Sequence, residues 1–128
     1  MLSIAVTSVF VDDQEKPSSS TRGVLGFTKK RDLPVGEASW LTVVPPAAPD
    51  GVERLLEPNS NPISRTYQQA TYEAGIPATT FTTEDIEEEY RRMTERGVVF
   101  TVPPARSGDV TGAVFDDTCG NLVGLFQA

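Results

Sequence analysis

Short apolar runs of strand length alternate with turn-forming residues along most of this 128-residue chain. The pattern is clearest near the end, where residues 112–115 and 122–126 flank six residues that favour turns and so predict a closing hairpin. Within each run, alternate side chains share a face, so each predicted strand has two distinct sides. Further strands are predicted over residues 3–11, 37–44, 51–57, 77–83, 98–102 and 110–116.

Proline and glycine set several of the predicted strand ends. A short strand beginning near residue 24 is expected to fade through residues 29–32, and residues 33–36 then turn the chain. Pro45-Pro46 and Pro103-Pro104 are each expected to stop a strand, because proline has no backbone N–H to donate to a neighbour.

One helix is predicted between the halves of the chain. Asn61 and Pro62 are a suitable N-cap and first helical residue, and Gly75 closes the segment. Residues 17–23 have no apolar side chain, a proline and a glycine, so no packed amphipathic helix is expected there.

A second helix is predicted over residues 85–96. Asp85 and Glu88 have capping-box spacing, and Gly97 is placed to end the helix. The acidic run at residues 84–89 is then most simply a solvated helix face. Two pairs at i,i+4 spacing are expected on that side, Glu87 with Arg91 and Glu88 with Arg92.

The second half of the chain repeats the first. Asp85 lies 72 positions after Asp13, and Gly120 lies 69 positions after Gly51, so the halves stay in near register. Two tandem βαβββ modules are implied, which is an α+β fold. A module of this kind leaves one sheet face uncovered by its own helix, and two such faces can enclose a cavity.

Composition narrows the classes of function. Eleven basic and eighteen acidic residues give a net charge of −7, which disfavours nucleic acid or an anionic membrane as a partner and favours cationic ligands. No apolar run is long enough to span a bilayer, and the first eleven residues lack the features of a signal peptide. The single cysteine excludes an intrachain disulfide and fits a cytoplasmic protein.

The turn of the closing hairpin carries a family resemblance. A strand that ends in Asp117-x-x-Gly120-Asn121, followed directly by the last strand, resembles the vicinal oxygen chelate superfamily of glyoxalases, bleomycin-resistance proteins and extradiol dioxygenases. The resemblance implies a curved mixed sheet around a cleft and, commonly, a homodimer. One glyoxalase-like domain is expected, with module 1 at residues 1–58, a linking helix at 61–75 and module 2 at 76–128.

Catalytic members of the superfamily place four metal ligands on the first and last strands of their modules. The resemblance and the repeat together put these positions at Val6, Leu55, Ala78 and Gly124. None of these side chains binds a metal ion, and the chain contains no histidine, so no metal and no cofactor are expected. Glu53 and Glu57 share a face with Leu55 and are the alternative ligands if the register differs. Glu57 is also a candidate general base.

Other reactive side chains have structural explanations. Cys119 lies in a turn with no histidine to activate it, so a nucleophilic role is not expected. Asp13 and Asp85 are helix caps in this interpretation. Trp40 suits core or dimer packing as well as it suits a ligand-stacking surface.

The predicted function is binding of a small organic molecule, cationic or aromatic, in an acidic cleft of a metal-free homodimer. The alternatives are a metal-dependent lyase or dioxygenase with displaced ligands at Glu53 and Glu57, and a structural dimer without catalysis. No catalytic residue is assigned. Strand alternation predicts that the ligand-binding cleft is lined by Val6, Ser8, Phe10, Trp40, Thr42, Glu53, Leu55, Glu57, Thr80, Val114, Leu122 and Phe126.

Overall fold

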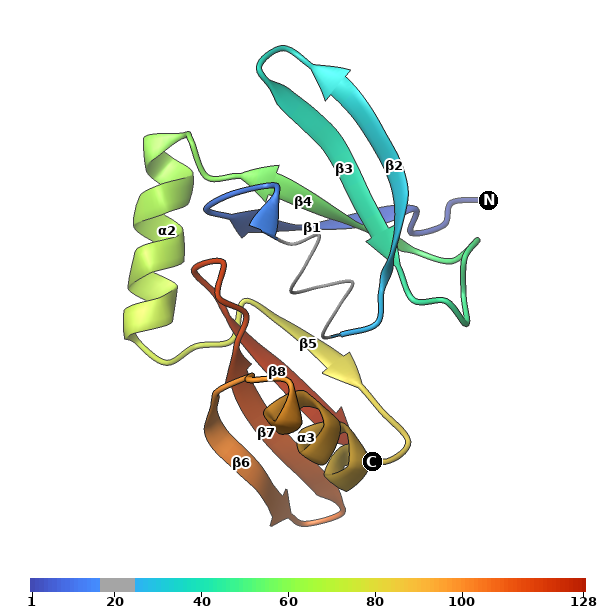
Figure 1. Ribbon diagram of the computed structural model, residues 1–128, viewed down its shortest axis with the longest axis vertical. Helices are drawn as coiled ribbons and strands as arrows, with labels where there is room; N and C mark the ends of the chain where they lie inside the picture. The colour runs from blue at the N-terminus through green and yellow to red at the C-terminus, as the bar shows by residue number, and fades with distance from the viewer. Residues whose placement is uncertain (17–24) are drawn as a thin grey trace. The chain divides into compact units, whose positions relative to one another are not determined.

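The computed structural model of the protein describes residues 1–16 and 25–128 (Figure 1). The predicted lack of a packed helix at residues 17–23 lies outside the described residues. The chain forms two compact units, Met1–Arg65 and Thr66–Ala128. The boundary between them falls inside helix α2, Pro62–Glu73, which is the helix predicted after Asn61.

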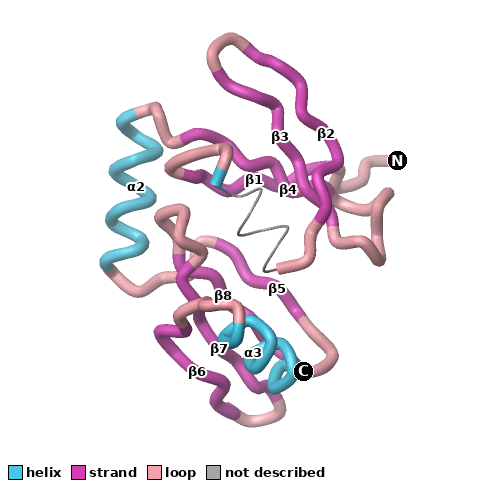
Figure 2. Tube along the Cα trace, viewed as in Figure 1, coloured by secondary structure: helices cyan, strands magenta, loops and turns pink. Residues whose placement is uncertain are grey.

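The first unit is a four-stranded mixed sheet, here called the N-terminal sheet. Its strand order is β1-β4-β3-β2, with β1 parallel to β4 and the other neighbours antiparallel. β2 and β3 form a long hairpin (Figure 2). The strands are β1 Val6–Val11, β2 Thr28–Val35, β3 Ala38–Val44 and β4 Glu53–Pro58.

The second unit contains the C-terminal sheet, whose order β5-β8-β7-β6 repeats the topology of the first sheet. Helix α3, Ile86–Glu95, contacts β6 and β8. The strands are β5 Thr79–Thr82, β6 Phe100–Ser107, β7 Val110–Asp116 and β8 Leu122–Gln127. The predicted α+β class and the predicted closing hairpin are confirmed.

The register of the two parallel pairs confirms the internal repeat. Ser8 of β1 is opposite Leu55 of β4, and Thr80 of β5 is opposite Gly124 of β8. These are the residues that the spacings of 72 and 69 positions relate to one another. The two halves of the chain therefore have the same strand pairing.

Each unit has buried residues on its own sheet. In the N-terminal sheet, Val11, Val43 and Leu56 are buried, and the side-chain amide of Gln14 donates to the carbonyls of Ser39 and Leu56 at 2.7 and 2.9 Å. This amide replaces hydrogen bonds that the two carbonyls would otherwise make to water.

In the C-terminal unit, α3 supplies the apolar cover. Ile86 and Met93 are each 2% exposed, and Tyr90 meets the edge of Phe100 with ring centroids 4.8 Å apart. Phe100 in turn contacts the buried Phe115 of β7. Ile86, Tyr90 and Met93 lie at i, i+4 and i+7 and so form one apolar face of the helix.

Two predicted strand ends were wrong, and the reason is the same for both. β6 continues through Pro103-Pro104 with an irregular register, and β2 continues through residues 33–35 before the turn at Gly36. Both are outermost strands of their sheets. One edge of such a strand has no neighbour within its sheet, so a missing N–H is tolerated there.

The predicted starts of β7 and β8 match the observed ones, and those of β1, β3, β4 and β5 are one to three residues too early, as for β1, which starts at Val6 and not at residue 3. The cap of α3 is as predicted, because the Asp85 carboxylate accepts the N–H of Glu88 and Gly97 has φ of +92°. The predicted ion pairs were wrong in their partners. Arg91 pairs with Glu88 and Glu95, and Arg92 pairs with Glu89.

Candidate functional site

One side of the N-terminal sheet collects all eight candidate site residues of the first module. The register places Ser8 opposite Leu55, and Leu55 opposite Thr42, so these three side chains share a side. Alternate residues extend the same side along each strand. We call this side the Trp40 face; it comprises Val6, Ser8, Phe10, Arg31, Leu33, Trp40, Thr42, Glu53, Leu55 and Glu57.

The four candidate residues of the second module also share a side of their own sheet. Gly124 is opposite both Thr80 and Val114, and Phe126 is opposite Gly112. We call this side the Phe126 face; it comprises Thr80, Thr82, Gly112, Val114, Leu122, Gly124 and Phe126. The candidate residues of each module therefore share one side of their sheet, as strand alternation in the sequence predicted.

The Trp40 face has a buried centre and an accessible apolar margin. Thr42 and Leu55 are 0% and 6% exposed, whereas Trp40 and its cross-strand partner Leu33 are 39% and 54% exposed. A tryptophan and a leucine paired directly across two strands form a continuous apolar surface. A flat apolar molecule could bury that surface.

A polar cluster borders this apolar pair. Glu53 Oε1 accepts a hydrogen bond from the Thr42 hydroxyl at 2.7 Å and from Arg31 Nε at 3.0 Å. These two donors, the Thr42 hydroxyl first, lower the pKa of the Glu53 carboxyl below its ordinary value of 4.5. Glu53 is therefore an ionised group that is already paired.

Arg31 was missed by the sequence reasoning because its strand was expected to fade there. The register of β2 and β3 shifts between Lys29 and Arg31, and Arg31 comes to lie opposite Thr42. No signal in the sequence marks this shift, because Lys29, Lys30 and Arg31 are alike in charge.

The turn that carries the family resemblance is held by a second residue that sequence reasoning missed. Gln68 of α2 is 5% exposed, and its Nε2 donates to Cys119 O and to Asn121 Oδ1, each at 3.1 Å. Asn121 Nδ2 donates in turn to Asp117 Oδ2 at 2.9 Å. The Asp117 carboxylate also accepts the backbone N–H groups of Cys119 and Asn121.

Burial nevertheless raises the pKa of Asp117, since the desolvation of its carboxylate outweighs these hydrogen bonds. Beside the turn, the Tyr72 hydroxyl donates to the Asp116 carboxylate, which raises the pKa of Tyr72. Asn121 thus links Gln68 of α2 to the Asp117 carboxylate within the turn. Cys119 is buried within it.

The family model described as the Glyoxalase/Bleomycin resistance protein/Dioxygenase superfamily matches residues 3–125 of the chain. The chain belongs to this superfamily. It is 48% identical over 126 residues to the uncharacterized protein YurT of Bacillus subtilis (strain 168), covering 98% of this chain and 99% of YurT. The uncharacterized protein YetH of the same organism is 33% identical, covering 93% of this chain and 92% of YetH.

Two solved structures share the fold of this chain. UcmS2 superposes with a TM-score of 0.85 at 27% identity, covering 98% of both chains. TnmS3, an antibiotic binding protein from Streptomyces sp. CB03234, superposes with a TM-score of 0.75 at 27% identity, covering 99% of this chain and 96% of TnmS3. The resemblance inferred from the closing hairpin is confirmed.

The superfamily implies a metal site, and the donor set of the described residues does not fit one. Nowhere in residues 1–16 and 25–128 do three histidine, cysteine, aspartate or glutamate side chains gather as a metal ion requires. The four mapped positions carry Val6, Leu55, Ala78 and Gly124. Glu53 lies on the same side as Leu55, but its Oε1 already accepts hydrogen bonds from Arg31 Nε and from the Thr42 hydroxyl.

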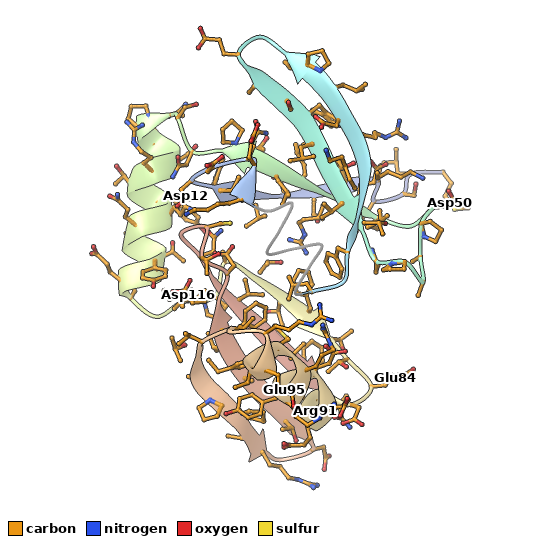
Figure 3. The ribbon with its side chains drawn as sticks, viewed as in Figure 1. Asp12, Asp50, Glu84, Arg91, Glu95 and Asp116 are labelled. Carbon is orange, nitrogen blue, oxygen red and sulfur yellow. The ribbon has the colours of Figure 1, made fainter. Side chains whose placement is uncertain are left out.

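The acidic run on α3 forms a solvated surface, as the sequence predicted. A shallow hollow there is lined by Asp85, Glu87, Glu88, Tyr90, Arg91, Thr94 and Glu95. Figure 3 shows Arg91 and Glu95 together on this helix, where their ion pair measures 2.7 Å. No helix among the described residues has the length and apolar character needed to cross a membrane.

Proposed function

We propose that this superfamily member binds a small aromatic molecule on its Trp40 face and performs no metal-dependent chemistry. The observation that carries the proposal is the accessible Leu33–Trp40 pair beside a fixed polar cluster. An apolar surface with a few oriented polar groups is typical of a site for a small organic ligand. TnmS3, which has this fold, is an antibiotic binding protein, and that likeness supports binding without catalysis.

The absence of fitting metal ligands supports the non-catalytic part of the proposal. A Lewis acid in this superfamily would need donors at the mapped positions, and those positions carry two aliphatic side chains, an alanine and a glycine. Glu53 and Glu57 are the alternative donors for a displaced site. Two carboxylates, one of them neutralised by Arg31, are a poor set for a transition metal.

Charge is the part of the sequence prediction that the geometry supports least. Glu53 was expected to give an acidic wall for a cation, but Arg31 pairs with it at 3.0 Å. Glu57 is the remaining carboxylate on this face. We therefore base the proposal on the aromatic surface and not on a negative potential.

The chain offers a direct test, because Trp40 is its only tryptophan. Intrinsic fluorescence then reports on this one position when a panel of flat aromatic compounds is added. Calorimetry with Trp40→Ala should show binding weakened by at least about tenfold, the loss that a cation–π or stacking contact and its buried area would produce. Tyr67→Ala is the matched control, since Tyr67 is an aromatic residue that is 64% exposed on α2.

Elemental analysis of the purified protein completes the test. The proposal fails if the panel gives no binding, or if Trp40→Ala and Tyr67→Ala bind equally well. Near one transition metal ion per chain, with lyase or dioxygenase turnover, would favour the enzyme alternative. A folded Trp40→Ala variant is required for the comparison and is checked by circular dichroism.

A further inference from the structure

Arg31 is the most accessible charged group on the Trp40 face that has a fixed orientation. Its side chain is 51% exposed, whereas the side chain of its partner Glu53 is 17% exposed. Its Nε donates to Glu53 Oε1, and within the part of the chain that the structure describes its two terminal nitrogens have no protein partner. A molecule that approaches this face therefore meets a cation before it meets the carboxylate.

The backbone of β2 is shaped to place Arg31 on this side. Lys29 is opposite Val43, and Arg31 is opposite Thr42, so Lys30 is an extra residue in β2 at that point. Without the extra residue, Lys30 would be opposite Thr42 and Arg31 would point to the other side of the sheet. Such bulges re-aim single side chains and are frequent beside functional sites.

Glu53 and Thr42 hold the guanidinium in place. Thr42 is fully buried, and its hydroxyl fixes Glu53 Oε1 at 2.7 Å. Glu53 Oε1 then receives Arg31 Nε, so the planar guanidinium is oriented by a chain of two hydrogen bonds. A guanidinium oriented through Nε leaves the edge formed by Nη1 and Nη2 available for a bidentate contact with a carboxylate.

The Leu33–Trp40 pair lies next to this edge. Leu33 is two residues beyond Arg31 on β2, and Trp40 is two residues before Thr42 on β3, so all four side chains share the Trp40 face. Diagonal neighbours on one face of a sheet are about 7–8 Å apart, a distance that a bicyclic aromatic acid spans.

We propose that the ligand is an aromatic carboxylate whose ring lies on the Leu33–Trp40 pair and whose carboxylate is held by the guanidinium edge of Arg31. This inference rests on the proposed function and names its ligand class. The net charge of the chain favours cationic ligands, but this inference favours an anionic one. The reason is local, because the Arg31 guanidinium is exposed and the Glu53 carboxylate that pairs with it is largely covered. Thr42 and Glu53 are positioning residues in this site.

The test compares three probes of one shape, namely 2-naphthoate, 2-naphthamide and 2-(aminomethyl)naphthalene, by calorimetry at pH 7. We expect 2-naphthoate to bind at least about tenfold more tightly than the other two, as a charge-assisted bidentate contact predicts. Arg31→Gln should remove that advantage and leave 2-naphthamide within about twofold of its parent affinity. Arg31→Lys, which keeps the charge but loses the planar fork, should recover only part of it.

Lys29→Gln is the matched control. It removes one positive charge from the same strand, but Lys29 faces the other side of the sheet and pairs with Asp32. The inference is overturned if 2-naphthoate binds no better than 2-naphthamide, or if Arg31→Gln and Lys29→Gln have equal effects. In either case, loss of 2-naphthamide binding in Trp40→Ala would leave the proposed function standing. No binding of any probe would overturn both.

Discussion

Gln68 Nε2 lies 3.1 Å from Asn121 Oδ1, so a residue of α2 holds the turn between β7 and β8. The same nitrogen donates to Cys119 O at 3.1 Å. Both acceptors belong to a turn in which the Asp117 carboxylate accepts the backbone N–H groups of Cys119 and Asn121 and the Asn121 amide. This contact joins two segments of the second unit that are about fifty residues apart in sequence.

We expect Gln68→Ala to lower the free energy of unfolding by about 1–3 kcal/mol, because two buried acceptors lose their donor. Gln69→Ala is the matched control, since Gln69 is the next residue of the same helix and is exposed. Its effect should stay within about 0.5 kcal/mol. Urea denaturation of both variants measures the difference, and equal midpoints would contradict the role given to Gln68.

Gly120 is constrained in two ways, by φ of +96° and by the Gln68 amide, which would lie 2.8 Å from an added Cβ. Gly97 has φ of +92° with open space around it. Gly97→Ala should therefore cost only the backbone strain, about 1–2 kcal/mol. Gly120→Ala should cost about 1–3 kcal/mol more, because the buried amide must also move. Thermal unfolding of both variants measures the difference in destabilisation. Equal losses of stability would show that the contact with the Gln68 amide adds nothing at Gly120.

Glu53 should make the stability of the protein depend on pH below 4.5. The pKa of its carboxyl is lowered on folding, so the stabilisation is present above pH 4.5 and is lost as pH falls through the folded value. In Glu53→Gln this titration is absent. The difference in unfolding free energy between parent and variant should therefore shrink as the pH is lowered below 4.5, as measured by urea denaturation at a series of pH values.

Thr42→Val provides a second test of whether the lowered pKa of Glu53 makes stability depend on pH. It keeps the shape of a buried side chain but removes the hydroxyl, which contributes most to the lowered pKa of Glu53. The acid-dependent part of the stability should decrease in this variant too. A pH profile unchanged from that of the parent would show that the hydroxyl does not set the ionisation of Glu53.

The protein should be a homodimer, because among residues 1–16 and 25–128 the outermost strands of each sheet have one edge without a neighbouring strand. β1 and β2 bound the N-terminal sheet, and β5 and β6 bound the C-terminal sheet. Such edges are commonly covered by another chain. Light scattering at micromolar concentration should return twice the 13.8 kDa mass of one chain. The monomer mass at that concentration would count against the prediction.

Sequence patterns predicted most of the strands and the residues that share a face of each, because the hydrophobic period and the internal repeat both report on them. Alternation placed Ser8, Thr42 and Leu55 on one side of a sheet, and the register agrees. The closing hairpin carried enough turn chemistry to indicate the superfamily. These are local signals, and side-chain period and turn residues encode them directly.

The polar cluster could not be predicted in the same way. Arg31 reaches the Trp40 face through a single-residue shift in register, and a shift of this kind reverses which of two neighbouring basic residues faces each side. Gln68 lies in a helix of otherwise exposed polar residues, and nothing in its neighbours marks it as buried. Both depend on contacts between segments distant in sequence, about which strand and helix periods carry no information.

The internal repeat makes positions of the two halves equivalent, and some equivalent positions carry side chains of very different size. Where the Trp40 face has Trp40 and Leu55, the repeat places Gly112 and Gly124 on the Phe126 face. At Gly124 even a methyl group would meet the Thr80 hydroxyl at 2.7 Å, so this position admits no bulk without displacing its neighbour. At these two equivalent positions the duplicated scaffold thus differs, with a tryptophan and a leucine in one copy and glycines in the other.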